Sequence, residues 1–296
     1  MTTLTIFANF YINDEERLLR MKDSFVSFKD IHAEKWVVNI RGRFKEEAMF
    51  FLKKYLNEKL ISYSLESKKG WFHDTKQMLK DIESDYVFLW LEDHINMIDV
   101  RKYQEILDEM EQCNSEYLHY SFFRSEDFGT PSEIYKNIEK TELKNTYTFV
   151  LDKEKNRLVR GSYVISILGF FSKELFKKII TRPPLLRWYP KQTPLDFEKG
   201  DGEPDWLPLN YAISKYELFA CIDDGDSSLQ ARGLYPKRVI RPNHKPIVVQ
   251  DAEWRIFFRT KIKKYIPALL YEKTIRRIVI FFRRLKRHLE LVSKGM

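Results

Sequence analysis

The stretch SDYVFLWLEDHIN, residues 84–96, decides the fold and also points to a site. Its apolar and aromatic run over residues 86–91 is typical of a strand buried on both faces of a parallel sheet. The run ends abruptly in Glu92, Asp93 and His94. An unpaired charge at the end of a buried strand costs several kcal/mol, so we expect these side chains to bind a charged ligand.

The segments around this stretch alternate between strand and helix patterns. β-rich apolar runs predict strands over 4–11, 34–42, 60–66 and 85–93, and apolar residues at helical spacing predict helices over 13–28, 45–59, 73–84 and 100–113. This order predicts βαβ units. We therefore expect an α/β fold, with a mostly parallel Rossmann-type sheet flanked by helices.

The pattern is looser after about residue 115. It predicts a strand over 116–123, two strands joined by a polar turn within 145–167, a short helix over 172–181, a helix over 206–215 and a strand over 218–223. Residues 182–206 are rich in proline, glycine and charge, which predicts a long loop. A loop of that length inside a domain usually has a function.

Composition limits the class of protein. With 296 residues and 44% hydrophobic residues, the chain is long and apolar enough for one large globular domain. Its two cysteines, Cys113 and Cys221, have no CxxC spacing, so we expect neither a disulfide framework nor a zinc site. This cysteine content fits a reducing compartment. We also expect no signal peptide and no membrane span, because no apolar run approaches about 18 residues.

The charge is unevenly distributed along the chain. Residues 255–296 contain 13 lysines and arginines and 2 acidic residues, a net charge of +11. Because the whole chain carries +8, the remaining residues carry −3. In this tail, apolar residues recur at three- and four-residue steps with arginines between them, which predicts a basic amphipathic helix. We place the domain boundary at 250, with the tail over 251–296.

Several motifs, taken in order, resemble the GT-A class of nucleotide-sugar-dependent glycosyltransferases, in particular family-2-like enzymes of bacterial surface-polysaccharide assembly. The matching segments are ANFYINDEERL, SKKGWFHDTKQML, LWLEDH, SILGFFSKELFKKI and GDGEPDWLPLNYAIS, within residues 4–245. The resemblance implies a GT-A-like domain that transfers a sugar from a nucleotide-sugar donor to a glycan or lipid-linked glycan. It also implies a divalent metal, Mn²⁺ or Mg²⁺, that bridges the diphosphate.

The metal motif departs from the Asp-X-Asp pattern of that class, because its last position is His94. Asp93 and Glu92 would hold the metal, with His94 as a nitrogen ligand favouring Mn²⁺. Alternatively His94 faces the diphosphate directly, and metal dependence is then in doubt. A purely structural alternative is that Glu92 and Asp93 cap the next helix or pair with Lys68 or Lys69. His244 is a further candidate ligand, or an ordinary loop histidine.

Other residues have candidate roles by position. Asp205 or Glu203 would take the proton of the acceptor hydroxyl in an inverting enzyme, although Asp205 also suits a helix N-cap. The candidates for contacting the nucleotide lie at strand ends or near the third predicted helix: Asn9, Tyr11, Asn39, Arg41, Lys69 and Trp71. The alternative for each of them is that it is an ordinary polar residue of the protein surface.

The basic tail favours an anionic membrane surface, at about 1 kcal/mol per basic residue near the surface. We therefore expect a cytoplasmic protein, peripheral on the inner face of the cell membrane, and no nucleic-acid partner. The aromatic surplus and the tail would both suit a homo-oligomer, which the sequence does not decide. Two rival functions stay open: a non-catalytic GT-A-like binding or scaffold protein at the membrane, and a nucleic-acid-binding protein that uses the tail.

Overall fold

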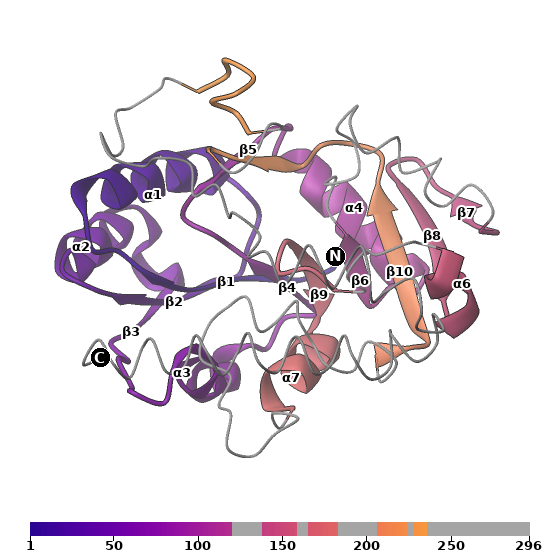
Figure 1. Cartoon of the computed structure of the whole chain (residues 1–296), viewed down its shortest axis with the longest axis horizontal. Helices are drawn as coiled ribbons and strands as arrows, with labels where there is room; N and C mark the ends of the chain where they lie inside the picture. Colours follow the sequence, from indigo (N-terminus) through magenta and orange to yellow (C-terminus); the bar gives the residue numbers. More distant parts are fainter. Residues whose placement is uncertain (120–137, 159–164, 183–205, 224–227, 236–296) are drawn as a thin grey trace, which may run out of the picture. The chain divides into compact units, whose positions relative to one another are not determined.

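Four parallel strands form the first half of the main sheet, in the order β3-β2-β1-β4 (Figure 1). They are β1 (Leu4–Tyr11), β2 (Lys35–Arg41), β3 (Leu60–Tyr63) and β4 (Tyr86–Leu89). The structure is a computed structural model and describes residues 1–119, 138–158, 165–182, 206–223 and 228–235, all within one compact unit, Met1–Arg238. The predicted tail over 251–296 lies outside the described residues.

The second half of the sheet mixes strand directions. β9 (Gly169–Ser172) lies antiparallel between β4 and β6 (Tyr117–His119). β10 (Leu209–Ser214) runs parallel to β6, and β8 (Thr146–Leu151) and β7 (Thr141–Glu142) complete a sheet of nine strands among the described residues. A separate antiparallel pair joins β5 (His94–Asn96) to β11 (Phe219–Cys221).

Helices cover both faces of the sheet (Figure 1). Apolar residues of α1 (Glu15–Phe28), α2 (Lys45–Leu56) and α4 (Arg101–Gln112) form one core with one side of the strands. Those of α3 (Trp71–Met78) and α7 (Lys173–Thr181) form a second core with the other side. Three short elements complete the described structure: η1 (Asn57–Lys59), η2 (Leu79–Asp81) and α6 (Lys153–Leu158). The predicted helix-flanked, mostly parallel α/β sheet is confirmed.

Strand β1 shows why both faces need a helix layer. Its alternate residues Ile6 and Ala8 pack into the first core, whereas Phe7 packs into the second. The Phe7 ring meets that of Phe176 on α7 at a centroid distance of 5.2 Å. With apolar side chains on both faces, β1 is stable only between two layers.

Two predictions after residue 115 are wrong. The segment expected as a helix over 206–215 forms strand β10, buried between β6 and β8. A short apolar run buried on both faces has no alternating pattern, so periodicity alone did not separate strand from helix. The polar turn expected within 145–167 forms the short helix α6. Of the second strand expected there, residues 159–164 lie outside the described residues, and residues 165–167 form no strand.

Within the described residues, no helix is both long and apolar enough to cross a membrane.

Close packing between β6 and β9 requires a glycine at 169. A Cβ atom placed on Gly169 would lie 2.6 Å from the carbonyl oxygen of Leu118 and 2.7 Å from the Tyr117 ring. Because the first contact is with backbone, the strands must separate to relieve it. We expect Gly169→Ala to lower the free energy of unfolding by about 1–3 kcal/mol, measured by urea denaturation.

The control is Val150→Ala, which truncates a side chain that is 46% exposed on β8. We expect that control to change stability by less than about 0.5 kcal/mol. Equal stabilities of Gly169→Ala and the wild type would contradict the strand pairing described here.

Candidate functional site

The segment after β4 is held by helix α1. Trp90, directly after the strand, is fully buried, and its indole N–H donates to Ser24 Oγ at 2.8 Å. The Ser24 hydroxyl in turn donates to the carbonyl oxygen of His94 at 2.5 Å. One buried side chain of α1 therefore fixes both ends of the turn that carries Glu92 and Asp93.

Glu92 lies beside Arg17 in α1, with a carboxylate oxygen and a guanidinium nitrogen 3.5 Å apart. Its partner is thus not Lys68 or Lys69. Desolvation raises the pKa of Glu92 to about 7, the Asp93 carboxylate adds to the rise, and Arg17 opposes it. A bound cation would favour the ionised form, as the sequence-based interpretation requires.

Asp93 and His94 contact each other, with Nδ1 of the imidazole 2.7 Å from Oδ1 of the carboxylate. Burial would raise the pKa of Asp93, but the charge and hydrogen bond of His94 outweigh burial and lower it. His94 is 5% exposed, and its Nε2 is buried with no hydrogen-bond partner among the described residues. A buried ring nitrogen of this kind is a donor atom that a cation can use.

Cys221 joins this pair from strand β11. It lies opposite His94 in the β5–β11 ladder, and ligand atoms of Asp93, His94 and Cys221 lie within 4.8 Å of one another. Sequence analysis missed Cys221 as a site residue. The strand pattern over 218–223 was visible, but no local signal indicates which segment it pairs with. Oxygen, nitrogen and sulfur donors together fit a divalent cation.

A buried guanidinium borders the cluster. Arg20 is 7% exposed and reaches Glu16 at 2.6 Å and Asp223 at 2.8 Å. Burial opposes the charge of Arg20, but Asp223 and Glu16 outweigh burial and raise its pKa. Arg20 also lowers the pKa of Asp93. Sequence analysis gave none of Arg20, Glu16 and Asp223 a role.

Asn9 and Asn39, predicted to contact the nucleotide, bond to the protein itself. Both are buried, and Asn39 Nδ2 donates to Asn9 Oδ1 at 3.0 Å. Asn9 Nδ2 donates to Thr75 Oγ1, and Asn39 exchanges hydrogen bonds with the backbone of Leu65. These amides join the ends of β1 and β2 to the region of α3.

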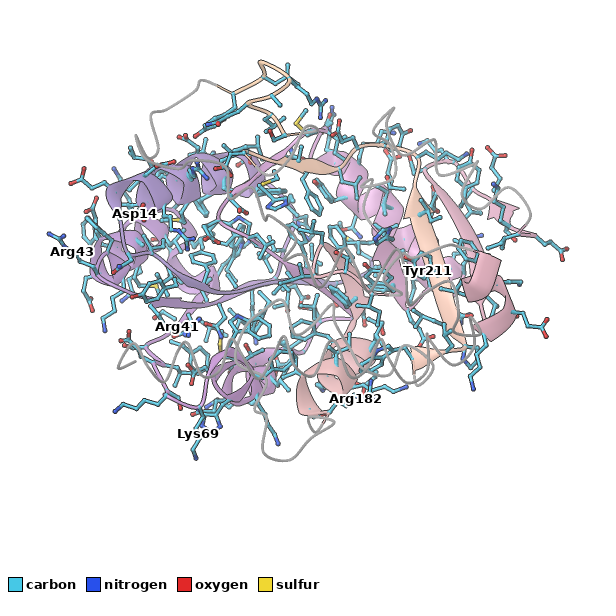
Figure 2. The ribbon with its side chains drawn as sticks, viewed as in Figure 1. Asp14, Arg41, Arg43, Lys69, Arg182 and Tyr211 are labelled. Carbon is cyan, nitrogen blue, oxygen red and sulfur yellow. The ribbon has the colours of Figure 1, made fainter. Side chains whose placement is uncertain are left out.

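The other nucleotide candidates differ in exposure. Trp71 is 1% exposed, and its indole N–H donates to the carbonyl oxygen of Asn9, so its ring packs in the core. Tyr11 and Arg41 are register partners at the ends of β1 and β2, and Tyr11 is exposed. Arg41 and Lys69 lie on the α3 side of the sheet (Figure 2). Burial lowers the pKa of Arg41, although Asp74 and Glu66 oppose that effect.

The remaining candidates, Asp205, Glu203 and His244, lie outside the described residues. Trp206, the residue after Asp205, is buried, and the Arg182 guanidinium lies 4.8 Å from its ring centroid.

A cavity of about 430 Å³ lies elsewhere in the described structure. Residues of β7, β8 and the end of α4 line it, among them Thr141, Thr148 and Cys113. None of the predicted site residues is among its lining residues.

Comparison with solved structures identifies the architecture. The crystal structure of TarS from S. aureus, a GT-A-like glycosyltransferase, superposes with a TM-score of 0.50 at 15% identity, over 74% of this chain and 36% of that chain. The fold is GT-A-like. A crystal structure of TarS 1–349 in complex with UDP-GlcNAc gives a TM-score of 0.47 at 16% identity, over 74% of this chain and 58% of that chain.

At this identity the likeness establishes the GT-A-like fold and not the substrate. The chain spans about a third, 36%, of the length of the TarS structure that superposes with a TM-score of 0.50. No family model and no curated protein sequence matches the chain.

Ser24 is the buried link between α1 and the strand end. Replacing it removes the acceptor for the Trp90 indole N–H and the donor to the His94 carbonyl. Each buried polar group left unpaired costs about 1–3 kcal/mol. We expect Ser24→Ala to lower the unfolding free energy by about 2–4 kcal/mol in urea denaturation.

The matched control is Ser64→Ala, the same substitution at an exposed serine. We expect that variant to unfold within about 0.5 kcal/mol of the wild type. If Ser24→Ala is no less stable than this control, α1 does not hold the Glu92–His94 turn through Ser24.

Proposed function

We propose that the chain is a nucleotide-sugar-dependent glycosyltransferase whose donor diphosphate binds at the carboxyl end of β4. One observation carries the proposal: Glu92, Asp93 and His94 follow a central buried strand of a GT-A-like sheet, where α/β proteins place their ligands. The turn that carries these side chains is held by α1 through Ser24. Burial, together with the Asp93 carboxylate, raises the pKa of Glu92, and a cation bound beside it would offset that rise.

The residues of this strand end have separate roles in the proposal. A divalent cation, when bound there, supplies positive charge to the leaving diphosphate. Asp93 and His94 bind that cation, and Glu92 lies beside them. Arg17, which is half-exposed next to Glu92, attracts the anionic diphosphate. On the α3 side, Arg41 and Lys69 provide positive charge for the nucleotide, and Tyr11 an exposed ring for its base.

The acceptor hydroxyl loses its proton to Asp205 or Glu203 in the proposal, as an inverting transferase requires one carboxylate base. The acceptor is a glycan or a lipid-linked glycan of cell-surface polysaccharide assembly. The net charge of +11 over residues 255–296 supports a protein bound to the inner face of the cell membrane through this tail.

The test is nucleotide binding followed by donor turnover. Purified protein is heated with a panel of nucleoside diphosphates and nucleotide sugars, including UDP and UDP-GlcNAc, with and without Mn²⁺, Mg²⁺ or Zn²⁺. We expect at least one nucleotide to raise the unfolding temperature, because a ligand that binds only the folded state stabilises it. Release of nucleoside diphosphate from that donor then measures turnover.

The variant is Asp93→Asn, which keeps the shape of the side chain and removes its charge. We expect turnover to fall by about 100-fold or more, with the unfolding temperature of the ligand-free protein nearly unchanged. The control, Asp30→Asn, removes an exposed carboxylate after α1 and should keep full turnover. Undiminished turnover in Asp93→Asn would remove Asp93 from the site.

Two other outcomes favour the rival functions. Nucleotide binding without turnover on any acceptor would indicate a GT-A-like binding or scaffold protein. No nucleotide binding, together with salt-sensitive nucleic-acid binding that is lost on deletion of 255–296, would indicate a nucleic-acid-binding protein.

A further inference from the structure

The β5–β11 ladder brings three different donor types to one place. Asp93 offers a carboxylate oxygen, His94 an imidazole nitrogen and Cys221 a sulfur, all within 4.8 Å of one another. The first two are neighbours in sequence, whereas Cys221 arrives from β11 as the register partner of His94. The donor set is therefore a product of strand pairing.

Backbone hydrogen bonds fix this arrangement on both sides. Ile222 N–H donates to the carbonyl oxygen of Asp93 at 2.8 Å, which continues the ladder past His94. The Cys221 carbonyl accepts from Leu229 N–H at 2.9 Å. The main chain at Cys221 is thus held between two segments.

The burial of the three side chains suits a site with one open position. His94 is 5% exposed, while the Asp93 side chain is 36% exposed, so solvent reaches the cluster from the Asp93 side. The buried Nε2 of His94 has no hydrogen-bond partner among the described residues. Three protein donors with one accessible side correspond to a catalytic-type cation site, in which the fourth position takes water or substrate.

The chemistry of the donors selects the cation. Mg²⁺ and Ca²⁺ take oxygen ligands almost exclusively, whereas imidazole and thiolate suit zinc and similar borderline cations. We propose that Asp93, His94 and Cys221 form a binding site for a zinc-class divalent cation, Zn²⁺ or Co²⁺, rather than for Mg²⁺. Cys221 binds as the thiolate and releases its proton to solvent. This inference deepens the proposed function, because the same strand end would face the donor diphosphate.

The required movement is small. Bonds of about 2.0–2.3 Å to a tetrahedral zinc ion imply donor–donor separations of about 3.3–3.8 Å. The donors lie within 4.8 Å of one another, so side-chain shifts of about 1 Å bring them to these separations. If no cation binds, Cys221 is simply a small apolar residue of β11.

The experiment uses Co²⁺ as a spectroscopic probe on the full, untagged chain, reduced and stripped of metal with a chelator. We expect a thiolate-to-cobalt charge-transfer band in the near ultraviolet and the visible bands of tetrahedral Co²⁺, saturating at one ion per chain. Equimolar Zn²⁺ should abolish the bands, whereas a hundredfold excess of Mg²⁺ should leave them. No nucleotide is present, so failure here is distinguishable from failure of the proposed function.

The two cysteines of the chain provide a matched pair of variants. Cys221→Ser should lose the charge-transfer band, and Cys113→Ser should keep it at full intensity. Cys221→Ala, with circular dichroism to confirm folding, serves if the serine variant does not fold. Asp93→Asn should keep the band but bind Co²⁺ about 10–100-fold more weakly.

The proposal is overturned if the wild type shows no charge-transfer band, or if the band survives in folded Cys221→Ser or Cys221→Ala. A band lost in Cys113→Ser but kept in Cys221→Ser would move the site to the other cysteine.

Discussion

The burial of β4 on both faces is the constraint on which the rest of the structure depends. Its four residues are buried, and the ring of Phe88 stacks on Phe170 of the neighbouring strand at 4.7 Å. A strand enclosed in this way has no room for charge along its length. Charge therefore begins only at the carboxyl end, where Glu92 is the first acidic residue to follow the strand.

Helix α1 stabilises the charged turn that follows β4. Ser24 pairs with the backbone of the turn, Arg17 lies beside Glu92, and Arg20 lies buried between Glu16 and Asp223. Charges that are removed from water need partners close by, since the desolvation of an isolated ion costs several kcal/mol. The helix thus does two things: it packs an apolar face on the sheet and it holds the charged turn in one conformation.

The small β5–β11 sheet decides the chemistry available at this end. Without it, the motif would be a run of oxygen donors with one imidazole, as expected for Mn²⁺ or Mg²⁺. With it, a thiol stands opposite His94. By contrast, the side-chain amides of Asn9 and Asn39 hydrogen-bond to each other between β1 and β2, and the Trp71 ring lies in the core. Of the six nucleotide candidates, Tyr11, Arg41 and Lys69 are the ones at or near the surface.

Apart from strand β5, the sequence by itself determined the alternating strands and helices of the first 112 residues, because each of these elements has its own local signal. Strand β1 was predicted with its observed bounds, and the charged end of β4 was found from the contrast between the apolar run over 86–91 and Glu92. Local signals failed for β10, whose residues are buried on both faces and so carry no alternation. Only the tertiary structure decided which distant segments meet: pairing between β5 and β11 depends on the whole sheet, so Cys221 had no signature beside Asp93 and His94 in the sequence.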